Sequence, residues 1–154
     1  MTFTNRHLSF SRVQRYEQCP KSFKLHYVEL APSEPGVELK FGKAAHWVLE
    51  QLVAEHVALG LAGPLSTERA MELWQHAWTS EGLTGVGLFQ EGIEILKAFV
   101  RSEGVVDPLD VLGVEKQFEI IVGRFRVVGG IDRVDRIDAE TIRIRDYKTN
   151  RVIF

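Results

Sequence analysis

Two carboxylates and an ammonium occur in apolar segments that read as strands of a protein core. Asp132 lies in segment 124–136, and Asp146 and Lys148 lie in segment 141–148. Successive side chains of a strand point to opposite faces, so Asp146 and Lys148 share one face. Charges among apolar side chains are unfavourable unless they are paired or bind a metal. The pattern therefore indicates a charged site.

The register of the two strands decides whether the carboxylates meet. If the strands pair about Ala139, positions 132 and 146 lie opposite each other, with Cβ atoms about 4.5–5.5 Å apart. Two carboxylates at that distance repel each other unless a cation lies between them. The same register gives the pairs Val134 with Ile144, Asp135 with Arg143 and, less favourably, Arg133 with Arg145.

The opposed carboxylates of Asp132 and Asp146 suggest a metal site, but alternatives to it remain open. A slip of one residue would move one aspartate to the other face. Loop 138–140 also lacks the glycine that three-residue hairpin loops usually carry. Asp146 and Lys148 could instead form a surface ion pair of little energetic value.

Composition limits the possible functions. The chain has 154 residues, 45% hydrophobic and 26% charged, which suits one domain with its own core. The net charge of -2 gives no global signal for nucleic acid, so any such contact must be local. A single cysteine, Cys19, excludes disulfide scaffolds and multi-cysteine zinc sites within the chain. Without a signal region or an apolar span, a cytoplasmic protein with no membrane partner is expected.

The pattern changes from helical to extended along the chain. Helices are predicted after Ser9 or Ser11, from Pro20 onward, over about 39–59, after a Thr67 cap, and over about 88–101. Strands are predicted over 111–122, 124–136 and 141–148. Helices followed by an antiparallel three-stranded meander indicate an α+β fold. We expect one domain over 1–154, mainly helical in 1–104 and mainly strand in 105–154.

Five segments carry a family resemblance. They are Leu8–Arg12, Tyr16–Phe23 with Tyr27–Val28, Phe41–His46, Gly130–Asp135 and Asp146–Thr149. In this order they resemble the PD-(D/E)XK nuclease superfamily, and within it the RecB/AddB-like exonuclease branch. The resemblance implies a restriction-endonuclease-like core. The family's C-terminal helix and strand are apparently missing, so a fragment of a longer protein, or self-association through Val152, Ile153 and Phe154, is expected.

The resemblance also implies a set of site residues. His46, Asp132, Asp146 and the backbone carbonyl of Tyr147 would bind Mg²⁺ or Mn²⁺. Lys148 would orient the attacking water or help to deprotonate it. Glu115 matches a position that is often acidic, where it could bind metal through water or hold a second ion. Asp132, Asp146 and Lys148 are thus the expected catalytic residues.

Several residues have simpler interpretations. Glu115 could be a solvated strand residue, and Asp135 is expected to pair with Arg133 or Arg143. Trp47, Trp74 and Trp78 are expected to pack in or near the core. A four-cysteine iron–sulfur cluster, which some relatives bind, cannot form here, so Cys19 is expected to be a small residue at a helix junction.

The expected function is metal-dependent hydrolysis of DNA, as an exonuclease in DNA repair or recombination and with a helicase subunit or domain as partner. A local set of basic residues that includes Arg12, Lys43 and Arg133 is expected to contact DNA. The alternatives are a catalytically inactive DNA-binding or scaffolding domain of a helicase–nuclease complex, and a nuclease that acts on RNA.

Overall fold

The chain is described by a computed structural model for residues 7–147. Its contacts divide it into two compact units. The first contains the residues up to Glu34 together with Lys116–Ile131, and the second contains Pro35–Glu115 and the residues from Asp132 onward. The predicted role of Val152, Ile153 and Phe154 in self-association lies outside the described residues.

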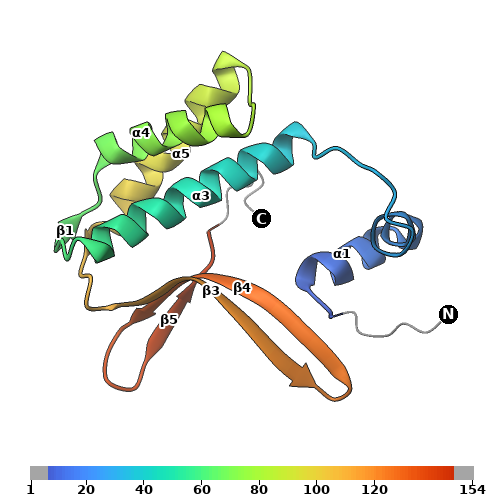
Figure 1. Ribbon diagram of the computed structural model, residues 1–154. Coiled ribbons are helices and arrows are strands. Elements are labelled where there is room, and N and C mark those ends of the chain that lie inside the picture. Colours follow the sequence, from blue (N-terminus) through green and yellow to red (C-terminus); the bar gives the residue numbers. More distant parts are fainter. Residues whose placement is uncertain (1–6, 148–154) are drawn as a thin grey trace. The chain divides into compact units, whose positions relative to one another are not determined.

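Helices precede a three-stranded antiparallel sheet of order β3-β4-β5, which confirms the predicted α+β fold (Figure 1). The helices are α1 Phe10–Gln18, α2 Pro20–Phe23, a π-helix η1 Lys24–Val28, α3 Val37–Ala58, α4 Thr67–Ser80 and α5 Val86–Glu103. The strands of this sheet are β3 Val111–Val122, β4 Phe125–Arg136 and β5 Ile142–Arg145. A second, unpredicted sheet pairs β1 Gly63–Pro64 with β2 Val105–Val106. No described helix is long and apolar enough to cross a membrane.

The second unit has a core between α3, α4 and α5 (Figure 1). The apolar positions of α3 that recur every three or four residues are all buried: Phe41, Ala45, Val48, Leu49, Leu52 and Val53. On α5 the buried positions are Gly92, Leu96 and Val100, which are spaced by one helical turn. Ala98 lies off this stripe and is exposed.

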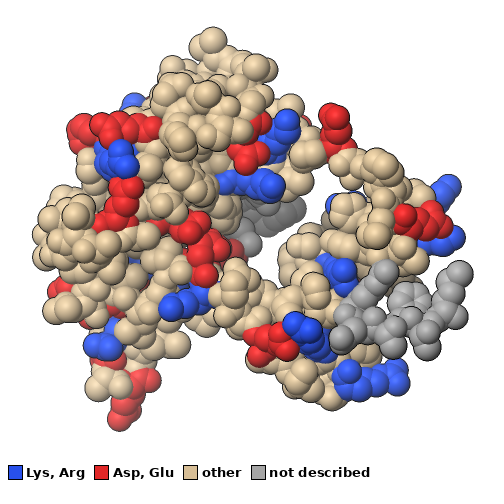
Figure 2. Space-filling view, in the orientation of Figure 1, with Lys and Arg blue, Asp and Glu red and all other residues tan. Residues whose placement is uncertain are grey.

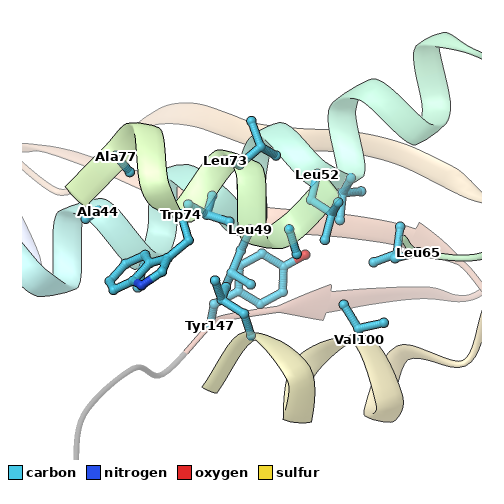
Figure 3. Close-up of a cluster of buried hydrophobic side chains, with 14 of the residues drawn as sticks. Ala44, Leu49, Leu52, Leu65, Leu73, Trp74, Ala77, Val100 and Tyr147 are labelled. Atoms are coloured by element: carbon cyan, nitrogen blue, oxygen red, sulfur yellow. The ribbon is translucent and has the colours of Figure 1, made fainter. Parts of the chain in front are cut away.

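Trp74 occupies the middle of this core. Its side chain is fully buried, and its indole N–H donates a hydrogen bond to the Phe89 carbonyl oxygen at 3.1 Å. Trp47 and Trp78 are partly buried against the same cluster, which confirms that the tryptophans serve packing. Figure 3 shows Trp74 and Tyr147 in one cluster with Leu49 and Val100.

The caps of two helices explain where they begin. Ser66, not Thr67, precedes α4, and its hydroxyl accepts a hydrogen bond from the Arg69 N–H at 3.1 Å. Pro20 is in the first turn of α2, as predicted. Cys19 lies at the predicted junction, exposed, and its Sγ accepts a hydrogen bond from the Ser22 N–H at 3.4 Å.

The β4–β5 hairpin has the register that the sequence predicts. Arg133 pairs with Arg145, Val134 with Ile144 and Asp135 with Arg143. The Asp138 carboxylate accepts a hydrogen bond from the Glu140 N–H at 2.9 Å and shapes the turn. An aspartate that binds the backbone two residues later supplies a turn without the glycine usual in three-residue loops.

The first unit joins α1, α2 and η1 to the β3–β4 hairpin. Leu8 forms a parallel bridge with Val127. The Leu8 N–H donates to the Arg126 carbonyl oxygen at 2.7 Å, and the Val128 N–H donates to the Leu8 carbonyl oxygen at 2.9 Å. The segment before α1 is therefore attached to the edge of β4.

Candidate metal centre

Three side chains from three elements of the second unit converge on one point. His46 comes from α3, Glu115 from β3 and Asp132 from β4. One potential ligand atom from each lies within 4.8 Å of the other two, and all three residues are half-buried. Two carboxylates and an imidazole are a donor set for a divalent cation.

Asp132 is the best-anchored member of the group. Its Oδ2 accepts a hydrogen bond from the backbone N–H of Tyr147 and lies 3.8 Å from the Nδ1 of His46. Its side chain is 15% exposed, against 36% for His46. The hydrogen bond fixes the direction of the carboxylate toward the imidazole.

Glu115 adopts an unusual backbone conformation, and the pKa of its carboxyl group is raised. Its φ of 48° lies in the left-handed region, which a residue other than glycine adopts at a cost of order 1–3 kcal/mol. Burial raises the pKa of Glu115, and the negative charges of Asp132 and Glu50 raise it further, while His46 acts in the opposite direction. Negative charge is therefore crowded at this point, and a cation would relieve it.

The spacing of the group fits a single ion. Two atoms that each lie ~2.1 Å from one Mg²⁺ can be at most about 4.2 Å apart. The 3.8 Å separation of His46 and Asp132 meets this limit. A carboxylate oxygen of Glu115 lies within 4.8 Å of the ligand atoms of both, close to the same limit.

The remaining residues predicted for this site have different positions. Asp146 is exposed and follows the last residue of β5, and its carboxylate is not part of the converging group. Lys148 lies outside the described residues. The structure thus brings together His46, Asp132 and Glu115. The predicted ligands were His46, Asp132, Asp146 and the Tyr147 carbonyl, with Glu115 as a possible ligand through water or of a second ion.

Tyr147 connects this group to the core. Its backbone binds Asp132, while its ring is buried and packs edge-on against Phe99, with ring centroids 5.1 Å apart. Burial raises the pKa of Tyr147 to about 12, against the opposing effect of the Arg133 charge. Its hydroxyl has no hydrogen-bond partner among the described residues. A core side chain therefore positions the N–H that orients Asp132.

Arg133 and Asp135 of β4, Arg145 of β5 and Glu103 of α5 form a ring of four charges. Arg133 contacts Glu103 at 2.8 Å and Asp135 at 2.5 Å, and Arg145 contacts the same two carboxylates at 2.7 and 2.6 Å. The predicted pairing of Asp135 with Arg133 is confirmed. Arg133 is 3% exposed, and its guanidinium binds the carboxylates of Glu103 and Asp135. Its predicted contact with DNA therefore has no support from this placement.

The other predicted DNA contacts lie on the surface of their own units. Lys43 is exposed on α3, three residues before His46. Arg12 is half-buried in the first unit, 4.7 Å above the ring of Tyr27. Lys, Arg, Asp and Glu side chains are interspersed over the face shown in Figure 2, in keeping with the net charge of -2.

Glu50 was absent from the predicted set, although its charge acts on Glu115. It follows His46 by one helical turn on α3, so the i, i+4 spacing could have indicated it.

Comparison with known proteins places these residues in a family. The chain is 27% identical over 173 aligned residues to the Gene 69 protein of Mycobacterium phage D29, an alignment that covers 92% of this chain and 61% of that protein. The chain thus spans less than two thirds of this relative's length. No solved structure matches the chain. The PD-(D/E)XK nuclease superfamily matches residues 7–152, so the chain belongs to the PD-(D/E)XK nuclease superfamily.

Proposed function

We propose that the chain is a Mg²⁺- or Mn²⁺-dependent deoxyribonuclease of the RecB/AddB-like branch, acting as an exonuclease in DNA repair or recombination. The observation that carries this proposal is the convergence of His46, Glu115 and Asp132 in a chain of a nuclease superfamily. The branch rests on the motif segments of the sequence, in particular Phe41–His46 and Asp146–Thr149. A helicase subunit or domain is the proposed partner.

The donor set supports a metal-dependent reaction. A divalent ion neutralises charge on a phosphate and generates hydroxide near neutral pH. His46, Glu115 and Asp132 would hold it, with the Tyr147 N–H keeping Asp132 in orientation. Oxygen-rich ligands suit Mg²⁺, and one imidazole shifts the preference modestly toward Mn²⁺.

Asp146 and Lys148 complete the proposed catalytic set. Asp146 would approach the ion from the end of β5, and the Tyr147 carbonyl would be a further ligand. Lys148 would orient the attacking water or take its proton, because an ammonium beside a cation loses its proton more easily.

A cleavage assay tests this function. Purified protein, freed of metal with EDTA, is incubated with linear duplex, single-stranded and covalently closed circular DNA, with and without Mn²⁺ or Mg²⁺. We expect metal-dependent loss of linear DNA while the closed circle survives. Asp132→Asn should abolish cleavage. Glu94→Gln, which removes an exposed carboxylate of α5 paired with Lys97, is the matched control and should cleave normally.

The same assay separates the alternatives. Binding of DNA without metal-dependent cleavage would favour a DNA-binding or scaffolding domain. Cleavage of the closed circle would contradict exonuclease action, and preferential degradation of RNA would contradict the DNA substrate.

A further inference from the structure

A hollow in the first unit has the size of a ligand site. It measures about 570 Å³ and is lined by residues between 7 and 28 and by residues 124–126. Pockets for small ligands are typically ~300–1,000 Å³ and combine apolar or aromatic walls with a few polar groups. All the described lining residues belong to the first unit, so the hollow is internal to it.

The walls of the hollow are aromatic and partly open to solvent. The rings of Tyr16 and Phe23 meet edge to face at 5.4 Å, and Phe23 and Tyr27 lie 5.2 Å apart. Tyr16 is 55% exposed and Phe125 is 48% exposed. Exposed aromatic faces can stack with planar groups such as nucleobases.

The charged side chains that line the hollow are all basic. They are Arg12, Arg124 and Arg126, and no carboxylate is among the described lining residues. Arg12 is held in place, because it donates to the His7 carbonyl oxygen at 2.9 Å and lies over Tyr27. Arg126 pairs with Glu119 at 2.7 Å, with both side chains about half-exposed, and such a pair exchanges easily for a phosphate.

Aromatic faces beside guanidinium groups match one kind of ligand. Single-stranded nucleic acid is bound by basic residues along its backbone and by aromatic rings on which its bases stack. A duplex offers no free base faces, because its bases are stacked on one another and paired. An acidic peptide would satisfy the charges but would leave the aromatic walls without a planar partner.

We propose that this hollow binds an unpaired DNA strand, with a base stacked on Tyr16 and phosphates bound by Arg12 and Arg126. The inference rests on the proposed function in that DNA is the substrate. It adds that the first unit binds the strand in its unpaired form, through residues outside the candidate metal centre.

Binding without cleavage tests the inference. Fluorescence anisotropy of a labelled 20-nucleotide strand and of its duplex is measured with the full chain in EDTA. The single strand should bind more tightly. Tyr16→Leu keeps apolar bulk but removes the ring, and it should weaken single-strand binding by about fivefold or more, the equivalent of ~1 kcal/mol. Tyr16→Trp should retain binding.

The salt dependence separates stacking from phosphate contact. Arg126→Gln should reduce the slope of log affinity against log salt concentration by about 0.7, the value for one phosphate of a single strand. Tyr16→Leu should leave this slope unchanged. Arg101→Gln, the same charge change at an exposed site on α5, is the control and should bind as the wild type does.

Three results would overturn the inference. They are equal affinity for the single strand and the duplex, wild-type affinity of Tyr16→Leu for the single strand, or a loss of affinity in Arg101→Gln as large as that in Arg126→Gln. Circular dichroism melting of each variant establishes that it is folded. If the wild type cuts DNA and Tyr16→Leu binds the single strand as tightly as the wild type does, the strand-binding role of the hollow is refuted and the nuclease function stands. If the wild type never cuts DNA but the variants lose strand binding, the nuclease function is refuted and the strand-binding role stands.

Discussion

Arg133 and Arg145 lie directly opposite each other on β4 and β5, and their guanidinium groups bind the same two carboxylates. Two like charges in opposed positions would destabilise a hairpin by themselves. Glu103 from the end of α5 and Asp135 from β4 convert the pair into a closed ring of alternating charge. The ring joins the β4–β5 hairpin to the end of α5.

Removal of one carboxylate from this ring should destabilise the fold. Glu103→Gln leaves the buried guanidinium of Arg133 and the partly exposed one of Arg145 with one carboxylate, and an uncompensated buried charge costs about 3 kcal/mol. We expect a loss of this size in the free energy of unfolding, measured with urea. Glu94→Gln on the same helix removes an exposed ion pair with Lys97 and should change stability by less than about 1 kcal/mol. Equal effects of the two changes would show that the ring contributes nothing specific.

Gly92 and Gly87 on α5 should respond oppositely to alanine. A Cβ on Gly92 would lie 2.0 Å from the buried ring of Trp74, so Gly92→Ala must displace the ring and should destabilise by about 1–3 kcal/mol. A Cβ on Gly87 meets nothing within 4 Å, so Gly87→Ala should stabilise by up to about 1 kcal/mol. Thermal melting of both variants measures the difference. If Gly92→Ala melts at or above the wild-type temperature, the packing of α4 on α5 is not as described.

Glu115→Gln should have opposite effects with and without metal. Its pKa is raised by burial and by the charge of Asp132, so the charged form is unfavourable in the metal-free protein. The glutamine variant should therefore melt higher than the wild type in EDTA, yet gain less from added Mn²⁺ because a ligand is lost. Glu119→Gln on the same strand, half-exposed and paired with Arg126, is the control. Equal gains from Mn²⁺ in the wild type and Glu115→Gln would remove Glu115 from the site.

Lys148→Ala should separate metal binding from catalysis. The proposed role of Lys148 concerns the water and the phosphate, so the variant should bind Mn²⁺ as the wild type does and lose cleavage by at least about 100-fold. Lys97→Ala, which replaces a partly exposed lysine of α5, should retain activity. Cleavage by Lys148→Ala at the wild-type rate would exclude this role.

The sequence predicted the register of the hairpin correctly, because strand periodicity and complementary pairs such as Asp135 with Arg143 depend only on register. The predicted strand 141–148 is longer than β5, which ends at Arg145. It did not predict how the Arg133–Arg145 pair is stabilised, since Glu103 lies on a helix end 30 residues before Arg133. Contacts between elements so distant in sequence leave no periodic signal.

The candidate metal centre was predictable only in part. His46, Asp132 and Glu115 were all named from the family resemblance, with Glu115 as a water-mediated or second-ion ligand, whereas the left-handed backbone of Glu115 within β3 is not indicated by any residue pattern. Asp146 follows Arg145, the last residue of β5, so the register of the strands does not determine the position of its carboxylate.

Calorimetric titration of Mn²⁺ into EDTA-treated protein tests the central claim most directly. If His46, Glu115 and Asp132 hold one ion, the wild type should bind Mn²⁺, and Asp132→Ala and His46→Ala should each bind it at least about tenfold more weakly. His76→Ala, which replaces a histidine of α4 outside the group, should bind as the wild type does. Equal binding of Mn²⁺ by wild type and Asp132→Ala would contradict the account.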